Sequence, residues 1–169
     1  HKTDDGLLPT KLVRKPLPLF LEGPTRWLQT SQTPAAKAQM VAAVQASPLF
    51  DRELKMYRLN ASLKNESFEI GRIRAFPDGW LENASIWLHM EYKYLLALLK
   101  SGLYEQFFTD FRNTAIPFLS PERYGRSTTE NSSFLVSSAN ADAAAHGRGY
   151  VSRLSGSTAE LISIWLEMF

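Results

Sequence analysis

The amino-acid sequence predicts a mainly α-helical fold with one small β-hairpin. Several segments carry apolar residues or alanine at helical spacing, and each begins or ends at residues typical of a helix boundary. Residues 54–76 instead mix apolar residues with alternating polar ones, and Lys64-Asn65 is their candidate turn. The chain has 169 residues, of which 44% are hydrophobic and 12% aromatic, so it can bury one core of ordinary domain size.

The first part of the chain is predicted to be irregular and then helical. Residues 1–33 are rich in proline and in Thr or Ser, but apolar residues recur among them, so we expect an irregular packed segment. A helix follows over residues 34–46, because Thr33 is a favourable N-cap, Pro34 suits the first helical position, and an alanine-rich run comes next. Ser47-Pro48 ends this helix, since a residue before proline avoids the α region.

Two further helices are predicted in the middle of the chain. The longer one covers residues 83–100, follows the turn at residues 76–79, and ends at Ser101-Gly102. The next covers residues 104–116, carries phenylalanines at helical spacing and stops before a proline. Residues 117–156 are rich in Ser, Asn, Gly and Ala and predict a long loop, a feature that is usually functional in a compact domain.

The last segment predicts a helix that starts at a capping box. Ser157 and Glu160 have the spacing at which the two side chains cap a helix start reciprocally, and apolar residues follow at helical spacing. No stop signal precedes Phe169, and the first residues look like the middle of a longer protein. We therefore expect residues 1–169 to be part of a larger catalytic domain that is truncated at both ends.

Composition argues against several classes of function. Lys and Arg number 19 against 17 Asp and Glu, a net charge of +2, which is not the basic surplus of a dedicated nucleic-acid binder. Without cysteine the chain has no disulfide, thiol nucleophile or Cys-ligated metal, and its histidines lack metal-ligand spacing. The longest apolar stretch, residues 86–99, is interrupted by polar and charged residues, so no membrane span is expected. With no leader sequence visible either, we expect a cytoplasmic protein.

Two candidate sites could bind an anion, although each has a plainer structural interpretation. Ser155, Gly156 and Ser157 precede the last helix, where backbone N–H groups and hydroxyls can approach an anion, but such residues are also ordinary helix caps. His89 lies in a helical apolar run and is either an anion ligand in a cleft or a satisfied core histidine.

Carboxylates and amides form a second group of candidates. Glu82 and Asn83 stand at a predicted helix start, where they either serve that start or belong to a site. Glu130 and Asn131 lie in the long loop, where their acceptors suit sugar hydroxyls or a solvated loop equally. His146, which comes shortly before Arg148, has a solvent-exposed turn as its plain interpretation.

Three stretches carry a family resemblance when they are taken together. They are residues 77–89, which run from Pro-Asp-Gly through Glu-Asn to His89, residues 130–134, and residues 146–149 with 155–157. Their order and spacing resemble the cellobiose phosphorylase-like glycoside phosphorylases of glycoside hydrolase family 94, most of all the 1,2-β-oligoglucan phosphorylase branch. The resemblance covers roughly residues 34–169. Ser155 stands where the family has Thr, Ala84-Ser85 replaces Gly-Gly, and the His-x-Gly spacing is shortened to His146-Gly147.

The resemblance implies an (α/α)₆ barrel whose C-terminal part is this chain, with residues 34–169 as its phosphate- and sugar-binding half. It implies an inverting phosphorolysis of a β-glucan or β-glucooligosaccharide by inorganic phosphate, the co-substrate, with no other cofactor and no metal. The implied phosphate ligands are His89, Ser155, Gly156 and Ser157. The implied substrate contact is Glu130, with Glu82, Asn83, Asn131 and Arg148 as further candidates.

Other expectations concern what the chain does alone and with partners. The family's general-acid Asp has no convincing counterpart in the chain and is expected upstream, so the isolated chain should be inactive. Its expected partners are an oligosaccharide, phosphate and the rest of the parent catalytic domain, with a homo-oligomer possible. Two alternatives stay open: an inverting glycoside hydrolase on the same barrel, and a non-catalytic carbohydrate-binding module that uses Trp80 and Trp87 as sugar platforms.

Overall fold

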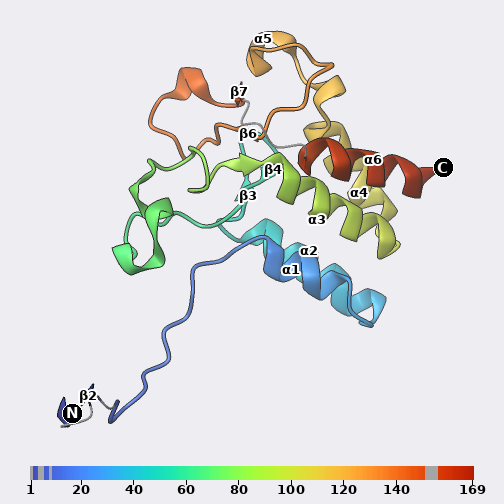
Figure 1. Ribbon diagram of the computed structural model, residues 1–169. Coiled ribbons are helices and arrows are strands. Elements are labelled where there is room, and N and C mark those ends of the chain that lie inside the picture. Colours follow the sequence, from blue (N-terminus) through green and yellow to red (C-terminus); the bar gives the residue numbers. More distant parts are fainter. Residues whose placement is uncertain (1, 4–5, 8, 151–155) are drawn as a thin grey trace.

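The structure is a computed structural model that describes residues 2–3, 6–7, 9–150 and 156–169. Its centre is helix α3 (Leu88–Lys100), against which α1 (Glu22–Leu28), α4 (Tyr104–Thr114) and α6 (Gly156–Met168) pack (Figure 1). Two further helices are α2 (Pro34–Ala46), which packs against α1, and the short α5 (Pro121–Tyr124). The described chain is mostly helical, which confirms the mainly α prediction.

Short antiparallel strands connect these helices. The strands are β1 (Lys2–Thr3), β2 (Gly6–Leu7), β3 (Phe50–Asp51), β4 (Met56–Tyr57), β5 (Ile86–Trp87), β6 (Phe134–Leu135) and β7 (Gly149–Tyr150). In the three-stranded sheet, β6 lies between β5 and β7, and the other strands form two-stranded pairs, β1 with β2 and β3 with β4. Single turns of 3₁₀ helix are η1 (Phe68–Ile70), η2 (Arg72–Ala75), η3 (Ile116–Phe118) and η4 (Ala143–Ala145).

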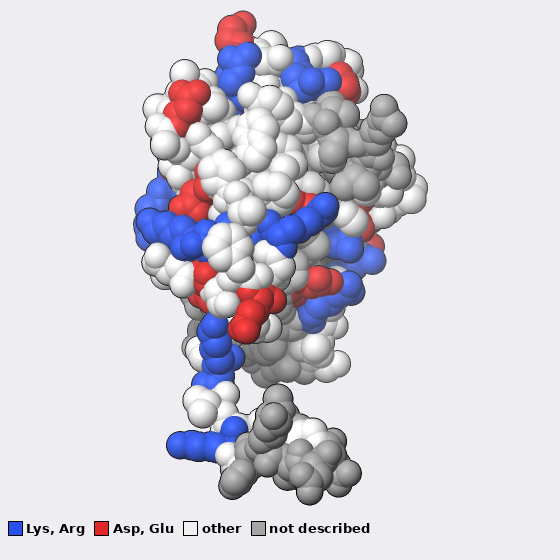
Figure 2. Space-filling model, turned by 60° about the vertical axis from the view of Figure 1, so that its left-hand side comes forward, with Lys and Arg blue, Asp and Glu red and all other residues white. Residues whose placement is uncertain are grey.

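The core is built around α3, which is buried on most of its circumference. A helix that is apolar nearly all round must be covered by neighbours, and here α1, α4 and α6 supply the cover. Among the described helices, α3 alone contributes nine buried residues. They are Leu88, Met90, Glu91, Tyr92, Tyr94, Leu95, Ala97, Leu98 and Leu99. On the face shown in Figure 2, basic and acidic side chains lie side by side, in keeping with the small net charge.

Helix α2 has the bounds that the sequence predicts. The Thr33 hydroxyl accepts a hydrogen bond from the N–H of Ala36 at 3.2 Å, and Pro34 opens the first turn. The helix ends as Ser47 turns to extended backbone before Pro48. Residues next to the two ends of α2 therefore determine where this helix begins and ends.

The hairpin predicted over residues 54–76 is wrong. The hairpin in this region is β3–β4, whose turn at residues 52–55 is held by the carboxylate of Asp51, which accepts from the N–H groups of Glu53 and Leu54 at 3.2 and 3.1 Å. The later residues form η1 and η2 instead of a strand. The Ser67 hydroxyl caps η1, and Gly71, at φ 105°, separates the two turns in a conformation that disfavours side chains.

The helix predicted over residues 83–100 begins only at Leu88. Leu81 and Ala84 adopt left-handed backbone, with φ values of 47° and 55°, so a helix cannot run through them. The chain then forms β5, which pairs with β6, before α3 starts. The helix predicted over residues 104–116 is correct in substance, although α4 ends at Thr114 and the extended residue Ala115 separates it from η3.

The two segments predicted to be irregular are partly ordered. Helix α1 lies inside residues 1–33, with Leu21 and Leu28 fully buried, whereas Leu12 is 89% exposed and the chain around it extends away from the body (Figure 1). The packed segment that we predicted therefore includes α1 and does not include the residues around Leu12. The predicted loop over residues 117–156 contains α5, β6, η4 and β7, and Phe134 and Leu135 of β6 pair with both β5 and β7. Within the described ranges, no helix has both the length and the apolar character that a membrane crossing requires.

Candidate functional site

The imidazole of His89 lies directly against the start of helix α6. A Cβ built on Gly156 would lie 2.6 Å from Nδ1 of His89, so a residue with a side chain could not occupy this position without moving the ring. On the other side of the ring, Nε2 is 3.4 Å from a carboxylate oxygen of Glu160. The His89 side chain is 34% exposed and that of Glu160 is 19% exposed. Two of the predicted phosphate ligands are therefore in contact.

The sheet and the packing of two helices create this contact. Strand β5 leads straight into α3, and the N–H of Leu88 donates to the carbonyl of Ser133 next to β6 at 3.0 Å, which fixes where α3 begins. Helices α3 and α6 then pack side by side along their lengths (Figure 1). His89 is the second residue of α3 and Gly156 the first of α6, so the starts of the two helices lie together.

The start of α6 has the electrostatic character of an anion site. The first N–H groups of a helix lack partners within the helix, and its dipole places partial positive charge there. Ser157 is buried in the first turn and Thr158 is exposed beside it. The helix begins at Gly156, one residue before the predicted capping position, so Ser157 lies inside it. Ser155, the remaining predicted phosphate ligand, lies outside the described residues.

Asn131 is the predicted substrate residue that joins this region. Its side-chain amide donates to the hydroxyl of Thr158 at 3.4 Å, and its carbonyl oxygen accepts from the hydroxyl of Tyr92 at 3.1 Å. Asn131 therefore connects α6 to α3 near His89. The neighbouring Glu130 points elsewhere, because its half-exposed carboxylate pairs with Arg126 at 2.9 Å.

The other predicted substrate residues make contacts in different parts of the fold. The buried Asn83 side chain accepts from the N–H of Leu63 at 3.0 Å and donates to the carbonyl of Phe76 at 2.7 Å, so both ends of its amide are used to hold loops together. Arg148 is exposed, and its guanidinium lies so close to Gly125 that a Cβ there would be 2.8 Å from it.

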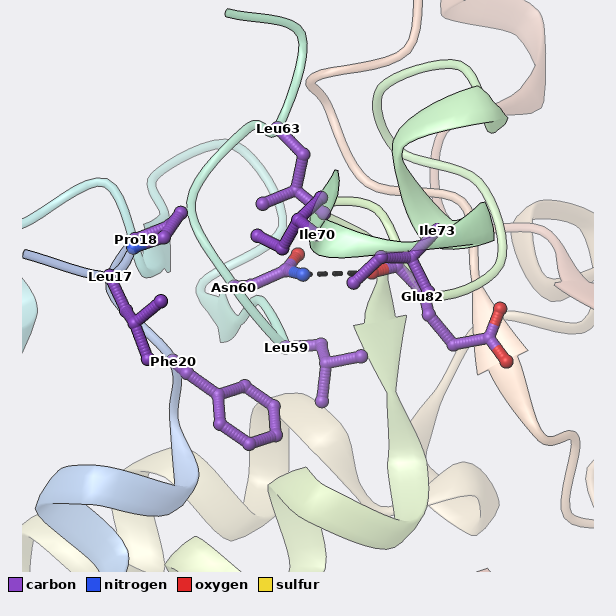
Figure 3. A pocket seen from close by; sticks show the side chains of 9 residues that line it. All are labelled: Leu17, Pro18, Phe20, Leu59, Asn60, Leu63, Ile70, Ile73 and Glu82. Atoms are coloured by element: carbon purple, nitrogen blue, oxygen red, sulfur yellow. Dashed lines mark hydrogen bonds between the residues drawn. The ribbon is translucent and has the colours of Figure 1, made fainter. Parts of the chain in front are cut away.

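Glu82 lies at an apolar pocket of about 320 Å³ (Figure 3). Leu17 and Phe20 from the N-terminal part and Ile73 from η2 contribute to its lining, and the Glu82 carboxylate points away from these side chains toward Arg72, which is 3.8 Å away. The rest of the lining is apolar except for Asn60, whose side-chain amide donates to the carbonyl of Glu82 at 2.8 Å and accepts from the N–H of Ala84 at 2.6 Å. With its amide engaged by backbone groups and the Glu82 carboxylate turned away, the pocket does not offer the hydroxyl-binding groups that a sugar subsite requires.

His146 lies in a turn, as its sequence context suggested, but its side chain is not exposed to solvent. Its side chain is only 10% exposed, Nδ1 lies 3.2 Å from the carboxylate of Glu53, and Nε2 lies 2.9 Å from the carbonyl of Asn140. Both ring nitrogens face acceptors, which only the protonated imidazole satisfies as a double donor. The Asn140 carbonyl raises the pKa of His146, burial opposes this, and Glu53 raises the pKa further. This histidine fastens the β3–β4 turn to the loop at residues 140–147.

Two buried acidic residues, Glu91 and Asp110, were not predicted from the sequence. Glu91 on α3 is fully buried, and one of its oxygens accepts from the N–H of Tyr57 at 3.1 Å and from the hydroxyl of Thr114 at 2.7 Å. Asp110 on α4 is 2% exposed and accepts from the hydroxyl of Tyr57 at 2.8 Å. Burial raises the pKa of Glu91 to about 8 and also raises that of Asp110. The only signal for this pair was a glutamate inside an apolar helical run.

The tryptophans proposed as sugar platforms are partly exposed and packed against other rings. Trp87 stacks on Phe134 with ring centroids 5.8 Å apart, and Trp80 meets Phe134 and Tyr150 edge-on at 5.2 and 4.6 Å. These contacts anchor the rings to β6 and β7. Among the described residues, no group of three His, Asp or Glu side chains is arranged to hold a metal ion.

No model of a protein family matches the sequence, and no curated protein sequence matches it.

Proposed function

We propose that the chain forms the phosphate-binding part of an inverting glycoside phosphorylase, which cleaves a β-glucan or β-glucooligosaccharide with inorganic phosphate and releases α-glucose 1-phosphate. The observation that carries the proposal is the contact between the imidazole of His89 and Gly156 at the start of α6. The motif resemblance to the family 94 phosphorylases supports the carbohydrate part of the proposal, including an (α/α)₆ barrel for the whole catalytic domain.

Inorganic phosphate is already a nucleophile, so the protein does not need to activate it. The protein must hold it below the anomeric carbon and offset its negative charge. Backbone N–H groups in the first turn of α6, which have no partner within the helix, can donate to phosphate oxygens, and His89 can add a donor from the side. Ser157 and Thr158 carry hydroxyls in the same turn. These groups bind a tetrahedral oxyanion without a metal.

The leaving group needs a proton from the opposite face of the sugar. A carboxylic acid placed there would protonate the glycosidic oxygen while phosphate attacks from below, which inverts the anomeric centre. No residue of this chain matches the family's general acid. The share of the reaction that we assign to the chain is therefore to bind phosphate and, through Asn131 and its neighbours, to face the donor sugar. An inverting hydrolase would have no use for an anion site in this position.

Titration of the purified chain with inorganic phosphate tests the proposal. The wild-type chain should bind phosphate, and His89→Ala should weaken binding at least tenfold, because it removes the side-chain donor next to the helix start. Lys100→Ala is the matched control, since Lys100 is a cation at the far end of the same helix, where it pairs with Glu167 at 3.5 Å. Circular dichroism should show that both variants fold. Equal phosphate affinity in the wild type and His89→Ala would refute the proposal.

A further inference from the structure

We infer that Glu160 is a built-in competitor for phosphate: its carboxylate holds His89 when the site is empty, and phosphate must displace it in order to bind. The inference rests on the proposed function of the same site. It assigns a regulatory role to a residue that neither the motifs nor the resemblance singled out as a ligand.

The geometry leaves one nitrogen of His89 for this exchange. The Nδ1 side of the ring is closed by the backbone at Gly156, where even one added carbon would lie 2.6 Å away. Nε2 faces the carboxylate of Glu160 at 3.4 Å. A phosphate that used His89 as a donor would need the direction that the Glu160 carboxylate now occupies.

Glu160 is well placed to act as an internal anion. It lies one helical turn after Gly156, so its carboxylate reaches back toward the positive end of the α6 dipole and toward His89. Its side chain is 19% exposed, so it lies partly within the fold while retaining access to solvent. The carboxylate therefore lies near the same two groups that would bind phosphate, the start of α6 and the imidazole of His89.

Phosphate and the Glu160 carboxylate cannot both lie next to Nε2 of His89 at the same time. A carboxylate within a few ångströms of a phosphate dianion is repelled, and the repulsion is stronger at a partly buried site than in water. Either the Glu160 side chain rotates away or phosphate does not bind. The apparent affinity for phosphate is then reduced by the fraction of molecules in which Glu160 holds His89. The pair also keeps the imidazole oriented toward the site while phosphate is absent.

Glu160→Gln tests the inference, because glutamine has nearly the same shape but no charge. The probe is inorganic phosphate, titrated into the full 169-residue chain by calorimetry. Phosphate should bind the variant three- to tenfold more tightly than the wild type. A residue with only a structural role would weaken binding or leave it unchanged when it is replaced, so tighter binding is the distinguishing result.

Glu167→Gln is the matched control. Glu167 lies on the same helix seven positions later and pairs with another side chain of α3, that of Lys100, at 3.5 Å. Its replacement should leave the phosphate affinity at the wild-type value. In the wild type, phosphate should also shift the ¹⁵N resonance of His89 Nε2, and Glu160→Gln should shift that resonance before any phosphate is added.

The outcomes separate the inference from the proposed function. If phosphate binds in a His89-dependent manner but with equal affinity to the wild type and Glu160→Gln, the inference is wrong and the phosphate site stands. If Glu167→Gln tightens binding as much as Glu160→Gln, the effect is one of net charge and the inference is also wrong. If neither the wild type nor Glu160→Gln binds phosphate, both proposals are wrong.

Discussion

Replacing Glu91 by glutamine should remove a fall in stability between about pH 5 and pH 8. Glu91 is fully buried on α3, where one oxygen accepts hydrogen bonds from Tyr57 and Thr114. Its other oxygen has no hydrogen-bond partner in the part of the chain that the structure describes. Burial therefore raises the pKa of Glu91 from 4.5 to about 8, so the folded protein carries this carboxyl protonated at neutral pH.

The sign and the size of the effect follow from linkage. Above pH 4.5 the unfolded chain loses this proton while the folded chain keeps it up to about pH 8, so stability falls as pH rises. The slope is about 1.4 kcal/mol per pH unit, and the accumulated cost at pH 7 is about 3 kcal/mol. This is a large share of the roughly 5–15 kcal/mol by which domains are stable. Glutamine keeps the accepting oxygen and cannot ionise, but its amide group adds buried donors that cost about 1–3 kcal/mol.

Urea denaturation at pH 5, 6, 7 and 8 measures the effect. The free energy of unfolding of Glu91→Gln, minus that of the wild type, should increase steadily across this range, by about 1 kcal/mol or more per pH unit. Glu167→Gln, a half-exposed glutamate on α6, should show no such trend. A Glu91→Gln difference that stays constant from pH 5 to pH 8 would show that the folded protein carries Glu91 ionised and would refute the reasoning.

Three further predictions concern single contacts. Gly156→Ala should displace the His89 ring, because the new Cβ would lie 2.6 Å from Nδ1, and should weaken phosphate binding at least tenfold by titration even though alanine favours helix. The raised pKa of His146 stabilises the folded wild type fully below pH 6.5, and this stabilisation is lost as pH rises through the pKa of the folded state. His146→Gln should therefore have a lower free energy of unfolding than the wild type at acidic pH, and urea denaturation should show the two values converging at alkaline pH. Asn83→Ala should destabilise the fold by about 2–4 kcal/mol in thermal or urea unfolding, because it leaves two backbone groups without their hydrogen-bond partners; a loss below 0.5 kcal/mol would contradict the hydrogen bonds described.

The sequence was a good guide to features that neighbouring residues decide. Thr33 and Pro34 start α2 through contacts within one turn, and the bounds of that helix were predicted correctly. The hairpin over residues 54–76 was misplaced, because the turn that forms is stabilised by the side chain of Asp51, and Asp51 also binds Ser138 from a distant loop at 2.7 Å. A periodicity argument contains no information on such a partner.

Some of the predicted site residues lie together in the structure, and others do not. The resemblance implied His89 and Gly156 as phosphate ligands, and the structure places both at the start of α6, together with the further candidate Asn131. The sugar contact that the resemblance implied, Glu130, pairs with Arg126 instead. Another candidate was Asn83, whose amide is engaged with backbone groups of two loops. A polar residue in a motif can serve the fold or the site, and only its contacts distinguish the two roles.

What the sequence determined by itself was the mainly α class and the starts of α2 and α4, because caps, prolines and apolar spacing act within a few residues. Only the tertiary structure decided which ionisable side chains lie in contact and which are buried. His89 and Glu160 belong to helices at distant points of the chain, and the packing of α3 on α6 brings them within 3.4 Å. The pKa of Glu91 is raised because three other helices cover α3 and exclude water from its carboxyl group. The local sequence pattern around Glu91 does not indicate this degree of burial.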